Sequence, residues 1–69
     1  MDDVNGIIAR NIKNMRHEKR LSQGKLADMI GCSLGTVYDW ERGKYAPSTI
    51  YLPAMADVFG CTIDALFGR

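Results

Sequence analysis

The chain has 69 residues, of which 46% are hydrophobic, 25% are charged and only two are proline, so its composition excludes disordered and collagen-like chains. No apolar run approaches the roughly 20 residues of a membrane-spanning helix, and the acidic pair Asp2-Asp3 is unlike the basic start of a signal peptide. We therefore expect one cytoplasmic domain over residues 1–69, too small to be a two-domain enzyme.

Two helices are predicted in the first 30 residues. Between residues 4 and 19, apolar side chains recur at the spacing of one helical face: Val4, Ile8, Ile12 and Met15. Ser22 suits the N-cap of a second helix, because its side-chain oxygen can accept a hydrogen bond from an amide of the first turn. Gly31 suits the left-handed residue that ends a helix. A short helix is therefore expected over residues 23–30, and it must gain stability from packing.

A third helix is predicted over residues 34–42. Ser33 suits its N-cap, and Gly43 follows its last residue. Val37 and Trp40 lie three residues apart, so they share one helical face and are expected to point into the core.

Two further helices are predicted in the last third of the chain. Ser48 is expected to cap the fourth, but Pro53 lacks the amide that a helix interior needs, so this helix either starts late or bends. Gly60 ends it, and Thr62 can cap a short fifth helix. The buried stripe expected for the fourth helix is Leu52, Met55, Ala56 and Phe59. The apolar contacts expected for the fifth are Ile63, Leu66 and Phe67.

Cys32 and Cys61 occupy equivalent places in two similar turns, each with the order apolar residue, Gly, Cys and hydroxyl residue. Metal sites use more closely spaced ligands, and His17 is the single histidine of the chain. In a reducing compartment both cysteines remain thiols. We expect small core residues at both positions, with no metal and no cofactor.

The positive charge is concentrated in one sector, although the whole chain carries only +1. Eight of the nine basic residues lie between residues 10 and 44 with four acidic residues, which makes this sector +4 and the remainder −3. A basic sector is typical of a surface that meets nucleic acid. Two short helices joined by a three-residue turn with a glycine form a helix-turn-helix arrangement, and residues 23–42 lie within this sector.

Residues at fixed offsets through the chain carry a family resemblance: Leu21-Ser22-Gln23, Leu26-Ala27, Gly31-Cys32-Ser33, Val37, Trp40-Glu41, Gly43 and Pro47-Ser48. This set resembles the Cro and phage-repressor (XRE-type) helix-turn-helix family. The resemblance implies an all-α fold, a compact lambda-repressor-like bundle of five helices in which residues 34–42 form the recognition helix. It also implies an ion pair between Arg16 and Glu41 that links the first and third helices.

The outward residues of the recognition helix are the candidates for reading bases, because the major groove admits one helix and displays a distinct pattern for each base pair. They are Leu34, Gly35, Thr36, Tyr38 and Asp39. The resemblance implies a backbone contact by Gln23, aided by the free amides at the start of its helix. The predicted phosphate contacts are Gln23, Lys25, Arg42, Lys44 and Tyr45.

The frequent base readers are absent from this face, since no Arg, Lys, Asn or Gln precedes Arg42 in residues 34–42. Leu34 can contact a thymine methyl group, and Asp39 can accept from a cytosine amino group. Specificity is then modest or rests on groove shape, unless the chain has lost DNA binding. Leu34 and Tyr38 as packing residues, and Asp39 as a solvated charge, are open alternatives.

The leading hypothesis is a non-enzymatic, sequence-specific regulator of transcription, a repressor that binds double-stranded DNA as a homodimer on a palindromic operator. Ile63, Leu66 and Phe67 are the predicted dimer surface. The alternative is a protein-interaction module on the same scaffold, for example antitoxin-like or polymerase-contacting. A small hydrolase has no support, because the sequence has no phosphate-binding glycine loop and no serine or cysteine beside a histidine. No membrane partner and no small-molecule substrate are expected.

Overall fold

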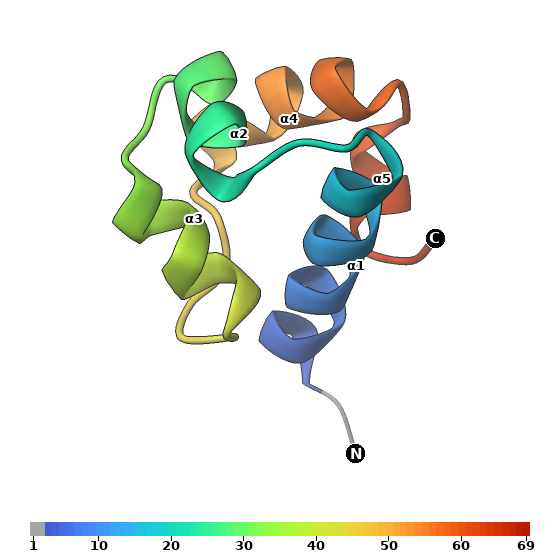
Figure 1. The fold of residues 1–69 in the computed structure, drawn as a ribbon. Helices are drawn as coiled ribbons and strands as arrows, with labels where there is room; N and C mark the ends of the chain where they lie inside the picture. The colour runs from blue at the N-terminus through green and yellow to red at the C-terminus, as the bar shows by residue number, and fades with distance from the viewer. Residues whose placement is uncertain (1–2) are drawn as a thin grey trace.

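A computed structural model describes residues 3–69 as an arrangement of helices without strands (Figure 1). In chain order these are α1 (Val4–Glu18), α2 (Gln23–Ile30), α3 (Leu34–Glu41), the 3-10 helix η1 (Thr49–Tyr51), α4 (Leu52–Phe59) and α5 (Ile63–Leu66). The described chain measures 31 × 23 × 23 Å along its principal axes. The predicted all-α, five-helix fold is therefore confirmed.

Side-chain caps begin three of the helices as the sequence predicts. Ser22 accepts from the backbone N–H of Lys25 at 3.0 Å, Ser33 from that of Thr36 and Thr62 from that of Ala65, both at 3.1 Å. Each cap satisfies one of the amides that a helix start leaves without an intrahelical partner. Gly31 and Gly60 end α2 and α4 with φ of 91° and 69°, the left-handed region that glycine adopts without steric cost.

The ends of three helices differ from the prediction by small amounts. Helix α1 ends at Glu18, and the left-handed residue that follows is Arg20, with φ of 57°. Helix α3 ends at Glu41, one residue before Arg42. Of the two outcomes open for Pro53, the late start is correct, because η1 occupies residues 49–51 and Pro53 falls in the first turn of α4. A proline is tolerated there, since first-turn amides have no intrahelical partner.

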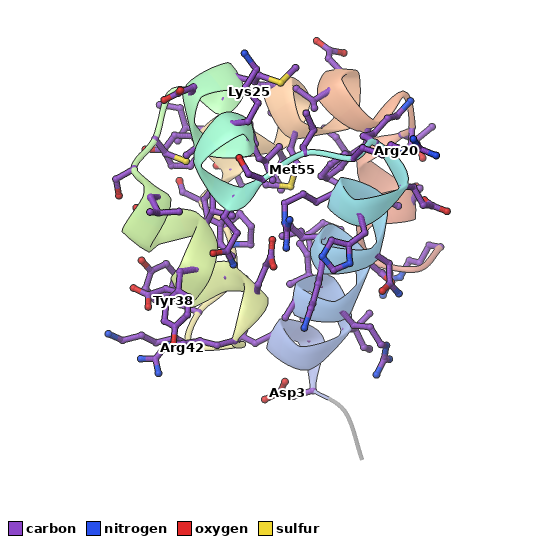
Figure 2. All side chains as sticks on the ribbon, viewed as in Figure 1. Asp3, Arg20, Lys25, Tyr38, Arg42 and Met55 are labelled. Atoms are coloured by element: carbon purple, nitrogen blue, oxygen red, sulfur yellow. The ribbon has the colours of Figure 1, made fainter. Side chains whose placement is uncertain are left out.

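The core draws buried side chains from all five α-helices. Its fully buried residues of greatest volume are Trp40, Ile8, Ile12, Leu26, Met55, Leu66 and Val37. Figure 2 shows Met55 at the centre of the molecule, between α2 and α1. The Trp40 ring also packs on Tyr51, with centroids 5.5 Å apart and ring planes tilted by 56°. This contact ties η1 to α3.

The predicted dimer surface is wrong for Leu66, which is 0% exposed and belongs to the core. A helix of four residues has few contacts available, so it attaches by burying a large aliphatic side chain. Phe67 is half-buried against the same core, and Ile63 is 39% exposed. Asn11 Nδ2 also donates to the Leu66 carbonyl at 3.0 Å, which joins α5 to α1. None of the helices described over residues 3–69 is both long and apolar enough to cross a membrane.

Candidate nucleic-acid interface

The turn between α2 and α3 sets the geometry of the interface. Gly31 N–H donates to the Ala27 carbonyl at 2.8 Å, and Cys32 N–H donates to the same oxygen at 2.9 Å, so the chain reverses tightly after α2. Ser33 then begins α3. Helix α3 packs against both α1 and α2, with Val37 and Trp40 buried, so its opposite side faces outward (Figure 1). The two helices therefore pack together and leave one face of α3 open.

The outward face of α3 mixes apolar and polar groups. Leu34 and Tyr38 are each 55% exposed, and Gly35 between them is exposed. An added Cβ at Gly35 would have only Ser33 Oγ nearby, at 3.9 Å, so the protein itself has room for a side chain there. Thr36 is half-buried, and its hydroxyl is bonded to Ser33 Oγ at 2.8 Å. Leu34 and Tyr38 are therefore the large groups that this face presents.

Asp39 is engaged by two neighbours on the same side of the molecule. Arg42 Nε donates to its Oδ1 at 3.1 Å, and Tyr45 Oη donates to its Oδ2 at 3.4 Å. The Arg42 guanidinium also lies over the Tyr38 ring, 5.7 Å from its centroid. Figure 2 shows Tyr38 and Arg42 side by side, away from the core around Met55. We refer to Tyr38, Asp39, Arg42 and Tyr45 as the Asp39 cluster.

An ion pair joins α1 to the end of α3. Arg16 Nε donates to Glu41 Oε2 at 2.6 Å, a second guanidinium nitrogen donates to Oε1 at 3.0 Å, and a third reaches the Leu21 carbonyl at 2.7 Å. Both side chains are buried, and the hydrogen bond to Glu41 raises the pKa of Arg16. Gln23 Nε2 donates to Glu41 Oε1 at 3.2 Å, so the same carboxylate orients the first side chain of α2.

A shallow hollow of about 180 Å³ opens where α1, α2 and α3 meet, lined by Lys13, Arg16, Gln23, Tyr38, Glu41 and Arg42. Its polar floor is the Arg16–Glu41 pair, and its rim carries two further cations, Lys13 and Arg42. Lys13 is not among the phosphate contacts predicted from the sequence. The sequence spacing could have pointed to Lys13, since it precedes Arg16 by three residues and so lies on the same side of α1.

The helix-turn-helix family model matches residues 12–66 of the chain. This chain belongs to the Cro and phage-repressor (XRE-type) helix-turn-helix family. Among curated relatives, the helix-turn-helix chain is 34% identical over 62 residues to the immunity repressor protein of Bacillus phage phi105, covering 90% of this chain and 43% of that protein. It is 32% identical over 69 residues to multiprotein-bridging factor 1c of Arabidopsis thaliana, covering 100% of this chain and 47% of that protein. It thus spans less than half the length of either relative.

A solved structure of the P22 c2 repressor, in complex with a synthetic operator, superimposes on the helix-turn-helix chain with a TM-score of 0.83 and 27% identity. The match covers 87% of this chain and 91% of that one. The likeness therefore extends over nearly the whole repressor chain in that complex and is not confined to the two helices of the motif.

The helix-turn-helix pair brings most of the predicted site residues onto α3 and the turn after it. Lys44 and Tyr45 are exposed in that turn, near Arg42 in sequence. Lys25 is exposed on α2, and Figure 2 shows it well apart from Tyr38 and Arg42. The cysteines lie elsewhere: both are half-buried free thiols, and burial raises the pKa of Cys32. Across residues 3–69, no three His, Cys, Asp or Glu side chains gather into a possible metal site.

Proposed function

We propose that this helix-turn-helix chain is a non-enzymatic, sequence-specific DNA-binding regulator, a cytoplasmic repressor that inserts α3 into the major groove. The observation that carries the proposal is the open face of α3, held outward by the buried contacts of Val37 and Trp40. A single α-helix fits the groove, and the neighbouring helix then crosses the backbone. The match to a repressor bound to its operator over 87% of this chain supports the same placement.

The base-reading residues in this proposal are Leu34, Gly35, Thr36, Tyr38 and Asp39. Leu34 supplies an apolar contact for a thymine methyl group, and Tyr38, which is equally exposed, supplies a hydroxyl. Gly35 keeps the space between them free, so the backbone can approach the base edges. With no bidentate amide or guanidinium reader between residues 34 and 41, groove shape contributes to the choice of sequence.

The phosphate-binding residues in this proposal flank that face, and they are Gln23, Lys25, Arg42, Lys44 and Tyr45. Gln23 uses one amide hydrogen for Glu41 and keeps the other for a phosphate oxygen. It lines the same hollow as Lys13 and Arg42, whose two positive charges favour an anion at that point. Lys13 is therefore added to the proposed phosphate contacts.

A homodimer on a palindromic operator completes the proposal. Two recognition helices can then reach half-sites about 34 Å apart along one side of the duplex. Ile63 and Phe67 support a dimer surface around α5, because Ile63 is exposed and Phe67 is only half-buried.

The test is the salt dependence of binding to duplexes selected from a random pool. We expect the affinity to fall steeply with salt, with a slope of about −0.9 in log–log form for each phosphate contact. Selected sequences should show two related half-sites. An affinity unchanged between low and physiological salt would contradict DNA binding by this basic face.

A protein-interaction module is the second candidate, and the likeness to multiprotein-bridging factor 1c over 100% of this chain favours it. The exposed tyrosines Tyr38 and Tyr45 suit a protein interface, where aromatic residues are enriched. No retardation of any duplex at low salt would favour this function over the first.

A further inference from the structure

The Asp39 cluster contains two donors suited to phosphate, Arg42 and Tyr45, that both bind one carboxylate. Arg42 and Tyr45 both donate to Asp39, at 3.1 Å and 3.4 Å, and Arg42 also covers the Tyr38 ring. Asp39 is the shared acceptor, and its two oxygens are divided between the two donors.

The two groups that donate to Asp39, the Arg42 guanidinium and the Tyr45 hydroxyl, are also suited to donate to a DNA phosphate. A phosphate oxygen accepts hydrogen bonds from guanidinium and hydroxyl groups as a carboxylate oxygen does. The Asp39 side chain is 25% exposed and that of Arg42 is 51% exposed, so the pair lies at the surface, where an incoming phosphate can compete. The negative charge of Asp39 also opposes the approach of any phosphate to this end of α3.

We propose that Asp39 is a specificity-determining positioning residue, which acts as an internal competitor of DNA phosphate for Arg42 and Tyr45. This inference rests on the proposed DNA-binding function. On a duplex of arbitrary sequence, Arg42 exchanges its hydrogen bond to Asp39 for one to phosphate, and this exchange adds little binding free energy. Non-specific binding therefore stays weak. On a duplex with a cytosine amino group beside α3, Asp39 gains a replacement donor and Arg42 is released to the backbone.

The experiment compares wild type with Asp39→Asn, using a fluorescent random-sequence duplex at several salt concentrations. Asn keeps the size of the side chain and removes its charge. We expect the variant to bind roughly three- to tenfold more tightly at low salt, with a log–log salt slope that is steeper by about 0.9, the value for one additional phosphate neutralised. The preference for selected sequences over random duplex should fall by a similar factor.

Two further variants separate this role from net charge and from direct repulsion. Asp57→Asn removes the same charge from an exposed position on α4, so it should leave the affinity and the slope close to those of wild type. In an Arg42→Gln background, Asp39→Asn should lose most of its effect, because the competition involves Arg42. Thermal unfolding of each protein checks that the fold is intact.

Three results would overturn the inference: unchanged binding by Asp39→Asn, an equal increase in affinity from Asp57→Asn, or an increase that persists in full without Arg42. In each of these cases wild type still binds DNA, and the proposed function stands. If neither wild type nor Asp39→Asn binds any duplex at low salt, the proposed function and the inference both fall.

Discussion

At the scale of single residues, Glu41 connects three helices. Its carboxylate binds the Arg16 guanidinium through two hydrogen bonds and accepts from Gln23. It therefore joins α1 to α3 and also orients the first side chain of α2. A buried charge is costly when it has no counter-charge, so each partner of this pair depends on the other.

Replacing Glu41 with Ala should destabilise the protein strongly, since Arg16 would stay buried without its partner. Removing one member of a buried ion pair costs about 3 to 5 kcal/mol, and the lower end is expected here because one side of the pair faces the shallow hollow. Urea unfolding followed by the fluorescence of Trp40, the single tryptophan, measures the change. Glu18→Ala is the matched control at an exposed position of α1 and should change the stability by less than about 0.5 kcal/mol.

At the scale of elements, the short helices depend on their ends. Helices α2 and α3 have eight residues each, a length that is marginal for an isolated helix. Capping serines begin both, and the left-handed Gly31 allows the chain to turn between them. The orientation of α3 therefore depends on a backbone conformation that most residues adopt only with strain.

Gly31→Ala and Gly24→Ala should change stability in opposite directions. Neither added Cβ meets an atom within 4 Å, so the backbone conformation alone decides the outcome. At Gly31, with φ of 91°, Ala should cost about 1 to 2 kcal/mol. At Gly24, inside α2, Ala should stabilise by about 0.4 to 1 kcal/mol, because it restricts the unfolded chain. Thermal unfolding of both variants is the measurement, and equal shifts of the same sign would contradict this explanation.

At the scale of the whole molecule, the residues proposed to bind DNA and those proposed to form the dimer lie on different elements. The shallow hollow and the Asp39 cluster are formed by α1, α2, α3 and the turn after α3, whereas Ile63 and Phe67 lie at α5. The core that separates them includes Trp40, Met55 and Leu66. A dimer formed around α5 would therefore leave α3 of each copy free for DNA.

Ile63→Asp should weaken dimer formation without unfolding the chain, since Ile63 is partly exposed and an acid is favourable in the first turn of a helix. We expect lower affinity for a duplex with two half-sites and unchanged affinity for a single half-site. Gel retardation on the two duplexes measures both. Ile50→Asp tests the rival apolar surface, because Ile50 is 76% exposed on η1. If Ile50→Asp loses cooperative binding and Ile63→Asp keeps it, the dimer surface lies at η1 and not at α5.

Much of the fold could be predicted from the sequence because its signals are local. Capping residues such as Ser22 and Ser33 and apolar side chains at helical spacing act within one or two turns of the chain. The end of α1 was predicted to within one residue, although the left-handed residue after it is Arg20 and no glycine marks the position. Part of the Asp39 cluster could also be predicted from the sequence, since Asp39 and Arg42 are an acidic and a basic residue three positions apart on one helix face.

The sequence by itself determined the helices, the basic sector and the family, since spacing, caps and charge are properties of neighbouring residues. Only the tertiary structure decided that Leu66 lies in the core, that Lys13 shares a hollow with Gln23 and Arg42, and that Tyr45 reaches Asp39. The first two contacts depend on how the helices pack around Trp40 and Met55, which no local pattern specifies. The third depends on the course of the turn after α3.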